Sequence, residues 1–333
     1  MYFFLADAYL HTIDPFAIEF SDGWGLRWYG LSYAVGFALA WLLTRWLART
    51  QRILIPLSAV GDFMIYLIVG VIVGGRMGYV LFYHPEYLVQ FTPDIPFWEA
   101  LAINRGGMAS HGGIIGVVLA SIIFGWRRGI SPWHVIDVSA FICPPGLFLG
   151  RIANFINGEL WGKPLPESAG TPWWSIQYPQ EIYQSQIDLE PLREVIPYEV
   201  GFKDQVVELA YQGDPQVTSY LQEQLTAFYP SQILQALSDG PILMAVLATV
   251  WLLPRKPGII SGTFLLTYGI LRIFTEVFRQ ADEGIEVIAG LQRGQLLSAF
   301  MVIAGAIILV ICGIRPVKRV GGLLKPVDGT DVA

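Results

Sequence analysis

The side chains best suited to chemistry in this chain gather in one short stretch, residues 150–162, which reads GRIANFINGELWG. The stretch leaves an apolar run and holds one arginine, one glutamate, two asparagines and three glycines. Charged groups are costly within lipid unless they face a cavity or the membrane interface, and glycine lets the backbone come close to a bound group. The stretch therefore predicts a binding site for a polar, anionic headgroup.

Four other ionisable side chains are expected at the same membrane depth as Arg151, namely Arg76, His111, Arg272 and Glu276. Each lies toward the outer end of its apolar stretch when the stretches are counted at 1.5 Å per helical residue. An arginine inside the membrane costs roughly 2.5 kcal/mol or more unless it is paired or hydrated, so three of them predict a nearby anion. The alternative is that Arg272 pairs with Glu276 one turn on, while Arg76 and Arg151 reach to the surface.

Tyr268, Arg272 and Glu276 are spaced four residues apart, so a helix would place them in one polar stripe. Guanidinium groups bind phosphate oxygens in a bidentate manner, and the stripe therefore predicts a site for a phosphodiester headgroup. His111 precedes two glycines at the start of an apolar stretch. An imidazole titrates near neutrality, which suits a proton acceptor, and the alternative for His111 is a hydrogen-bonding residue at a helix end.

The elements that position these side chains are predicted to be membrane helices. Of the 333 residues, 54% are hydrophobic and only 14% are charged, which is far too apolar for an ordinary soluble protein. Period-two alternation is not sustained anywhere, which argues against a transmembrane barrel. We therefore expect an all-α polytopic membrane protein. Seven stretches are long enough to span: residues 28–48, 59–83, 108–126, 133–153, 230–253, 258–278 and 293–314.

The orientation follows from the lysines and arginines. Eleven of them follow the first, third, fifth and seventh stretches: Arg45, Arg49, Arg52, Arg127, Arg128, Arg255, Lys256, Arg315, Lys318, Arg319 and Lys325. Basic residues concentrate on the cytoplasmic side, so we expect the N-terminus outside and the C-terminus in the cytoplasm. Cys143 and Cys312 both lie in apolar stretches far apart in the sequence and indicate neither a disulfide nor a metal site.

A polar insertion, residues 163–228, carries ten acidic residues against three basic ones. Its scattered apolar residues predict a small folded cap, and the alternative is a solvated loop. The N-terminal arm lacks the basic region of a signal peptide and is expected on the outer surface. The predicted division is the arm at 1–27, membrane helices at 28–162, the insertion at 163–228, membrane helices at 229–314 and a cytoplasmic tail at 315–333.

Four further motifs accompany residues 150–162: residues 27–31, 75–79, 111–113, and 268–272 with Glu276. In this order they resemble the motifs of the prolipoprotein diacylglyceryl transferases. The resemblance implies seven membrane helices with a periplasmic head in the inner membrane of a bacterium. It implies transfer of diacylglycerol from phosphatidylglycerol to the lipobox cysteine of a prolipoprotein signal peptide, with glycerol 1-phosphate leaving.

The resemblance also implies the roles of individual residues. The catalytic set is His111, Arg272, Tyr29 and Glu276, and the substrate-binding set is Arg151, Asn154, Glu159, Gly162, Arg76 and Tyr268. The substrate brings the nucleophile, so no cofactor, no metal and no nucleic acid is expected. The enzyme needs only to orient the reactants, stabilise the departing phosphate and help to remove the thiol proton.

The chain departs from the family pattern at several places. Residues 229–235 read YPSQILQ, where the family usually has His-Pro-Ser/Thr-Gln-Leu-Tyr-Glu. Residues 279–282 lack the usual Glu-Pro, Ala153 stands for a glycine, and the insertion is long. These departures bear on partner specificity more than on the chemistry.

Two other functions fit parts of the pattern. A transporter is suggested by the buried Arg and Glu and by the helix break at Pro144 and Pro145. The inner half, however, offers only scattered acids such as Asp62 and Asp137, so no polar path is visible. A non-catalytic lipid-binding relative would keep the headgroup site and lack the transfer.

Overall fold

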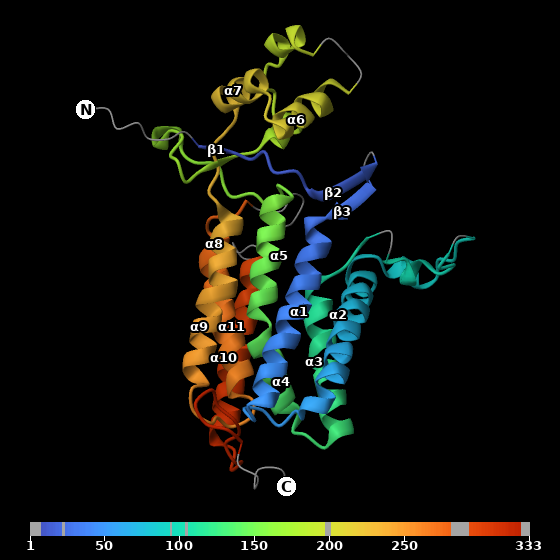
Figure 1. Cartoon of the computed structure of the whole chain (residues 1–333), viewed down its shortest axis with the longest axis vertical. Helices are drawn as coiled ribbons and strands as arrows, with labels where there is room; N and C mark the ends of the chain where they lie inside the picture. The colour runs from blue at the N-terminus through green and yellow to red at the C-terminus, as the bar shows by residue number, and fades with distance from the viewer. Residues whose placement is uncertain are drawn as a thin grey trace. The chain divides into compact units, whose positions relative to one another are not determined.

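The computed structural model describes residues 8–21, 24–93, 95–103, 106–196, 201–280 and 293–327, and helices dominate it (Figure 1). The helices are α1 (Trp28–Arg49), α2 (Val60–Tyr83), α3 (Ser110–Arg128), α4 (Pro132–Ile142), α5 (Pro144–Ile156), α6 (Phe202–Gln212), α7 (Pro215–Gln224), α8 (Ser231–Leu237), α9 (Leu243–Val250), α10 (Ile259–Glu276) and α11 (Arg293–Ile314). The strands are β1 (Tyr9–Leu10), β2 (Phe16–Ser21), β3 (Trp24–Arg27) and β4 (Ile176–Gln177).

Within the described residues, six helical segments are long and apolar enough to cross a membrane: Trp28–Arg49, Leu57–Tyr83, Pro132–Ile156, Ser231–Val250, Ile259–Glu276 and Gly294–Ile314. The prediction of a polytopic helical membrane protein is confirmed. Helix α3 coincides with the remaining predicted span but is not one of the six, so the count of seven stays a prediction.

Two of the spans are interrupted. Helix α4 ends at Ile142, and α5 begins at Pro144, because proline fits the first turn of a helix and cannot continue the hydrogen bonds of the preceding one. Between α8 and α9 lies a single π-helical turn, Ser238–Ile242, which contains Pro241. The sequence predicts the helix break at Pro144 and Pro145, whereas it predicts one continuous helix across residues 238–242.

The chain forms two compact units. The first comprises residues 1–36, 146–242 and 268–300, and the second comprises residues 37–145, 243–267 and 301–333. Helices α1 and α10 each contribute to both units. These boundaries differ from the five consecutive segments expected from the sequence, so that division stays a prediction.

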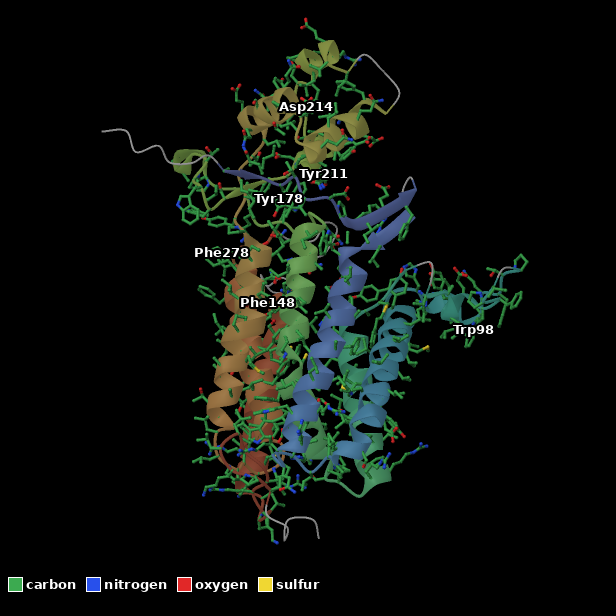
Figure 2. All side chains as sticks on the ribbon, in the orientation of Figure 1. Trp98, Phe148, Tyr178, Tyr211, Asp214 and Phe278 are labelled. Carbon is green, nitrogen blue, oxygen red and sulfur yellow. The ribbon has the colours of Figure 1, made fainter. Side chains whose placement is uncertain are left out.

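In the first unit, the insertion 163–228 contains the helices α6 and α7. Their apolar residues recur at helical spacing and meet Leu10 of β1 and apolar residues from the flanking segments in one buried cluster. Its other members are Ile182, Leu189, Leu192, Ile196, Val206, Val207, Ala210, Val217, Leu221 and Leu225. Asp214 begins α7 by accepting the backbone N–H groups of Gln216 and Val217 (Figure 2). The described part of the insertion therefore has a packed core of its own.

Short strands join the N-terminal arm to this unit. β1 pairs with β4 in parallel, with Tyr9 opposite Ile176, and β2 pairs with β3 in an antiparallel hairpin that leads into α1 (Figure 1). No strand is predicted here from the sequence, because runs of two to six residues are too short to show a sustained alternation of apolar and polar residues.

In the second unit, α2 and α3 pack backbone against backbone. Gly70 and Gly74 of α2 face Gly116 and Gly112 of α3, so the helices run antiparallel. A Cβ atom at Gly116 would lie 1.9 Å from the carbonyl oxygen of Gly70. Small residues allow membrane helices to approach this closely, and here they fix α3, which carries His111, against α2.

The N-terminal end of α10 is capped from another helix of the same unit. The buried carboxylate of Asp137, on α4, accepts the backbone N–H of Gly258 and that of Ser261, both at 2.7 Å. These donors belong to the first turn of α10, which has no partners within its own helix. Asp137 therefore stabilises the start of the helix that carries Tyr268 and Arg272.

Candidate active site

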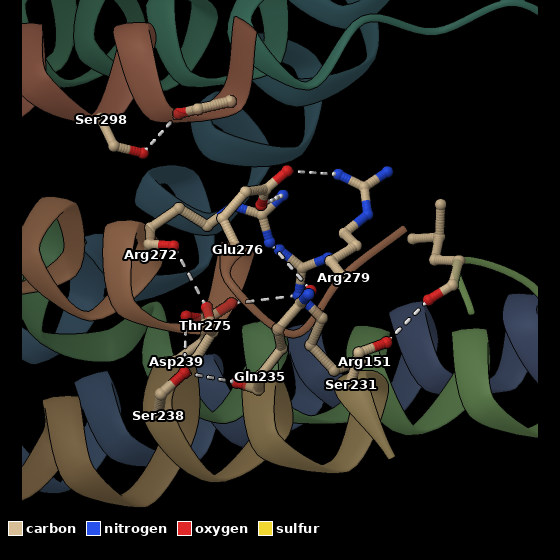
Figure 3. A network of polar contacts seen from close by, with 12 residues as sticks. Arg151, Ser231, Gln235, Ser238, Asp239, Arg272, Thr275, Glu276, Arg279 and Ser298 are labelled. Atoms are coloured by element: carbon tan, nitrogen blue, oxygen red, sulfur yellow. Dashed lines mark hydrogen bonds and ion pairs between the residues drawn. The ribbon is translucent and has the colours of Figure 1, made fainter. Parts of the chain in front are cut away.

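Arg151 is held in place by a carboxylate from a distant part of the chain. Its Nε donates to Oδ2 of Asp239 at 3.0 Å, and the Asp239 side chain is fully buried. Tyr268 on α10 is within electrostatic reach of Arg151. The Arg151 guanidinium thus links α5 to the segment between α8 and α9 (Figure 3).

Asp239 owes its position to the π-helical turn. Proline lacks the N–H that an α-helix needs at its position, so Pro241 favours a local rearrangement of the helix. Gly240 lies against Phe148 of α5, where an added Cβ would come within 2.6 Å of the Phe148 Cβ. The turn therefore packs against α5 three residues before Arg151, which brings the Asp239 carboxylate to the guanidinium.

Helix α10 supplies the second part of the network. Arg272 pairs with Glu276 one turn on, with Nη2 and Oε2 at 3.1 Å, and its Nη1 donates to Oε1 of Gln235 at 2.8 Å. Arg279 donates to the other carboxylate oxygen of Glu276 at 3.2 Å. The pairing of Arg272 with Glu276, which the sequence analysis gives as the alternative to a nearby anion, is present, and Gln235 of α8 joins it (Figure 3).

The network carries more positive than negative groups. Among the described residues that it joins, three are guanidinium groups and two are carboxylates: Arg151, Arg272 and Arg279, with Asp239 and Glu276. A buried excess of positive charge is costly unless an anion completes it. The arrangement is therefore suited to binding a monoanionic group such as a phosphodiester.

Residues 157–162 form a loop at the end of α5. Nδ2 of Asn154 donates to Oε1 of Glu159 at 3.1 Å, so these two predicted site residues hold each other. Gly162 is predicted to bind substrate, and in the structure an added Cβ at this position would lie 2.1 Å from the carbonyl oxygen of Tyr229. Glycine at this position lets the loop lie against the segment that leads into α8.

Tyr29, near the start of α1, lies in the same unit. Its ring centroid is 5.4 Å from that of Tyr33, and the Tyr33 side chain is within electrostatic reach of Arg151 and Glu159. Tyr33 is therefore a residue near the site that was not predicted from the sequence. It lies one helical turn beyond Tyr29, and this spacing could have indicated that both tyrosines lie on the same face of α1.

Arg76 belongs to the second unit and uses its donors on backbone carbonyls. Nε donates to Ala100 at 2.9 Å, Nη1 to Gly106 at 2.6 Å and Nη2 to Glu99 at 2.5 Å. These bonds favour a role in ordering the segment before α3 over direct contact with a headgroup. His111, the second residue of α3, is exposed and lies in the same unit. The predicted convergence of these two residues with Arg151 stays a prediction.

Asp62 and Asp137, the two acids named for the transporter alternative, both bind other groups of the protein. Asp62 pairs with Arg128, and Asp137 is used in capping α10. Both carboxylates therefore have structural partners within the second unit. This weakens the transporter alternative.

Comparison with known proteins agrees with the motifs. The profile of the prolipoprotein diacylglyceryl transferase family matches residues 15–311. The chain belongs to this family. It is 38% identical to the phosphatidylglycerol–prolipoprotein diacylglyceryl transferase of Bdellovibrio bacteriovorus, over 91% of this chain and 93% of that protein. Proteins of the same name from Rhodospirillum centenum and Xylella fastidiosa are 38% and 35% identical, over 92% and 98% of this chain and 94% and 99% of those proteins.

Two further residues of the candidate site were missed by sequence reasoning. Asp239 lies 88 positions from Arg151, in an apolar segment, and an acid inside a span was the signal for it. Gln235 drew notice only as a departure from the family motif, yet it contacts Arg272 directly. Of the other departures, Ala281 and Asp282 lie outside the described residues.

Proposed function

We propose that this chain transfers the diacylglyceryl group of phosphatidylglycerol to the lipobox cysteine of prolipoproteins. The names of its relatives support the two substrates. The observation that carries the proposal in this chain is the buried network of α5, α8 and α10, with its excess of guanidinium groups among the described residues. Such a network suits the phosphate of an anionic lipid donor.

The reaction is a substitution at carbon. The cysteine sulfur forms a bond to the carbon of the diacylglyceryl group that is linked to the phosphate, and the bond between this carbon and the phosphate oxygen breaks. The electron pair of the broken bond stays on the phosphate oxygen, glycerol 1-phosphate leaves, and the thiol proton passes to a base. Arg151 and Arg272 stabilise the departing phosphate, and Asp239 and Glu276 hold these two guanidinium groups in position.

The remaining roles follow from the contacts. Asn154 and Glu159, which hydrogen-bond each other, present polar groups beside the headgroup, and Tyr268 lies within electrostatic reach of Arg151. Tyr29, whose ring lies against that of Tyr33, contributes to the same side of the headgroup site. His111 accepts the thiol proton, directly or through water. We further propose that the protein lies in the bacterial inner membrane, with the N-terminus in the periplasm and the C-terminus in the cytoplasm.

The test supplies purified protein with phosphatidylglycerol and a synthetic lipobox peptide. The peptide should gain the mass of one diacylglyceryl group, and a peptide with serine in place of the cysteine should stay unmodified. A folded protein that binds the lipid and leaves the cysteine peptide unmodified would overturn the proposal, and would favour a non-catalytic lipid-binding relative.

A further inference from the structure

Gln235 has a fixed orientation in the buried network. Its side chain is 1% exposed, and its Oε1 accepts the hydrogen bond from Nη1 of Arg272 at 2.8 Å (Figure 3). A guanidinium group has donors and no acceptor, so the amide atom that faces it must be the oxygen. The other amide atom, Nε2, is therefore the remaining donor.

Nε2 of Gln235 is buried and has no hydrogen-bond acceptor among the described residues. Nearly all buried polar groups in proteins are paired, and a buried donor without an acceptor is destabilising. Gln232, three residues earlier on α8, shows the usual situation. Its Nε2 donates to the carbonyl oxygen of Glu159 at 2.7 Å, and its Oε1 accepts from Tyr178 at 3.2 Å.

The surroundings of Nε2 select the acceptor. Nε2 and Oε1 share one carbon atom, so Nε2 lies beside the Arg272 guanidinium, in a network where guanidinium groups outnumber carboxylates among the described residues. Gln235 is neutral, so it adds no negative charge to this network. An oxygen that accepts both from the amide and from a guanidinium is best supplied by an anionic phosphate.

We infer that Nε2 of Gln235 donates a hydrogen bond to a phosphate oxygen of the donor lipid and so increases the affinity of this chain for a phosphate-bearing headgroup. The inference rests on the proposed function and deepens it. The amide completes, with Arg272, a pair of neighbouring donors that a carboxylate at position 235 would not provide. Gln235 is therefore a specificity residue of the lipid site.

The test compares Gln235→Glu with the matched control Gln232→Glu. Glutamate at 235 still accepts from Arg272 but lacks the amide donor, so the thermal midpoint without ligand should not fall. Glutamate at 232 loses a donor that the protein itself uses, so the midpoint should fall. The binding probes are short-chain phosphatidylglycerol, glycerol 1-phosphate and short-chain diacylglycerol without phosphate. Gln235→Glu should bind both phosphate compounds roughly tenfold or more weakly and diacylglycerol unchanged.

Three results would contradict the inference. Unchanged affinity of Gln235→Glu for phosphatidylglycerol would remove the donor role. A fall in its thermal midpoint as large as that of Gln232→Glu would show that Nε2 has a partner within the protein. If Gln235→Glu weakens the binding of glycerol 1-phosphate but not that of phosphatidylglycerol, the amide donor serves the released product and not the lipid. If the wild-type protein does not prefer phosphatidylglycerol to diacylglycerol, it is the proposed function that fails.

Discussion

Arg151 and Arg272 are each held by a buried carboxylate, and this pairing has two consequences for the site. Asp239 and Glu276 reduce the cost of keeping the guanidinium groups inside the membrane. They also fix the directions of the remaining donors before any ligand arrives. The phosphate therefore meets groups that are already oriented, so little reorganisation is needed when the leaving group develops its charge.

Replacing His111 by glutamine tests its role as the base. Glutamine can hydrogen-bond but cannot take up a proton near pH 7. A thiol with a pKa of about 8.5 is mostly protonated at neutral pH, so transfer by His111→Gln should fall at least tenfold at pH 7 and recover in part as the pH approaches 8.5. Initial rates of peptide modification across this pH range measure the effect. Near-native transfer at pH 7 would leave His111 with a structural role.

At the residue scale, the sequence predicts partners that are close along a helix and misses those that the fold brings together. Glu276 lies one turn from Arg272, so their pairing follows from helical spacing. Asp239 lies far from Arg151 in the sequence, and only the π-helical turn and its packing on Phe148 bring the two together. Such long-range pairs depend on how the helices pack, which a single sequence does not specify.

At the element scale, the contact between α2 and α3 predicts a difference between two glycines of one helix. An added Cβ at Gly116 would collide with the backbone of Gly70, whereas at Gly113 the nearest atom is 3.8 Å away. Gly116→Ala should lower the free energy of unfolding by about 1–3 kcal/mol, and Gly113→Ala should leave it unchanged or slightly raised. Thermal unfolding in detergent compares the two variants. Equal midpoints would show that the close approach is not needed.

Burial of His11, which follows β1 in the first unit, predicts that the stability of the protein depends on pH. Its ring packs against Phe155 and Tyr178, with centroids 5.2 and 5.5 Å away, and burial lowers the pKa of the imidazole. The unfolded chain then binds a proton more readily than the folded one. The contribution of buried, neutral His11 to the free energy of unfolding should therefore be fully present above about pH 6.5. It should be lost as the pH falls toward the lowered pKa of the folded state.

The measurement compares wild type with His11→Phe, which keeps an aromatic ring and cannot titrate. Unfolding midpoints at pH 7.5 and 5.5 should differ less in the variant than in the wild type. The same acid-induced loss in both proteins would place its origin elsewhere.

The helix limits themselves were largely predictable. Residues 28–48, 59–83 and 293–314 are expected as spans, and α1, α2 and α11 begin and end within one residue of them. Apolar length and terminal charge determine these limits. The break at Pro144 follows from its two prolines, whereas the interruption at residues 238–242 was not predicted, because it lies within a stretch whose hydropathy is continuous.

At the scale of the whole molecule, the eleven basic residues predict one orientation in the membrane. Ser219 on α7 and Ser58 between α1 and α2 are both exposed, so serine-to-cysteine changes there are small. With the outer membrane opened, an impermeant thiol reagent should label Ser219→Cys in whole cells and should label Ser58→Cys only after lysis. The wild type, with Cys143 and Cys312, is the control. The reverse pattern would contradict the orientation and the assignment of the site to the periplasmic side.

The central claim is that the network on α5, α8 and α10 serves a transfer from phosphatidylglycerol to a cysteine thiol. The most direct measurement follows both products in one reaction, the modified lipobox peptide by mass spectrometry and the released glycerol 1-phosphate by its own assay. The account predicts equal amounts of the two, both dependent on the peptide thiol, and a large loss of both in Arg151→Lys, which keeps the charge but not the bidentate donors. Release of glycerol 1-phosphate without peptide modification, or native transfer by a folded Arg151→Lys variant, would contradict it.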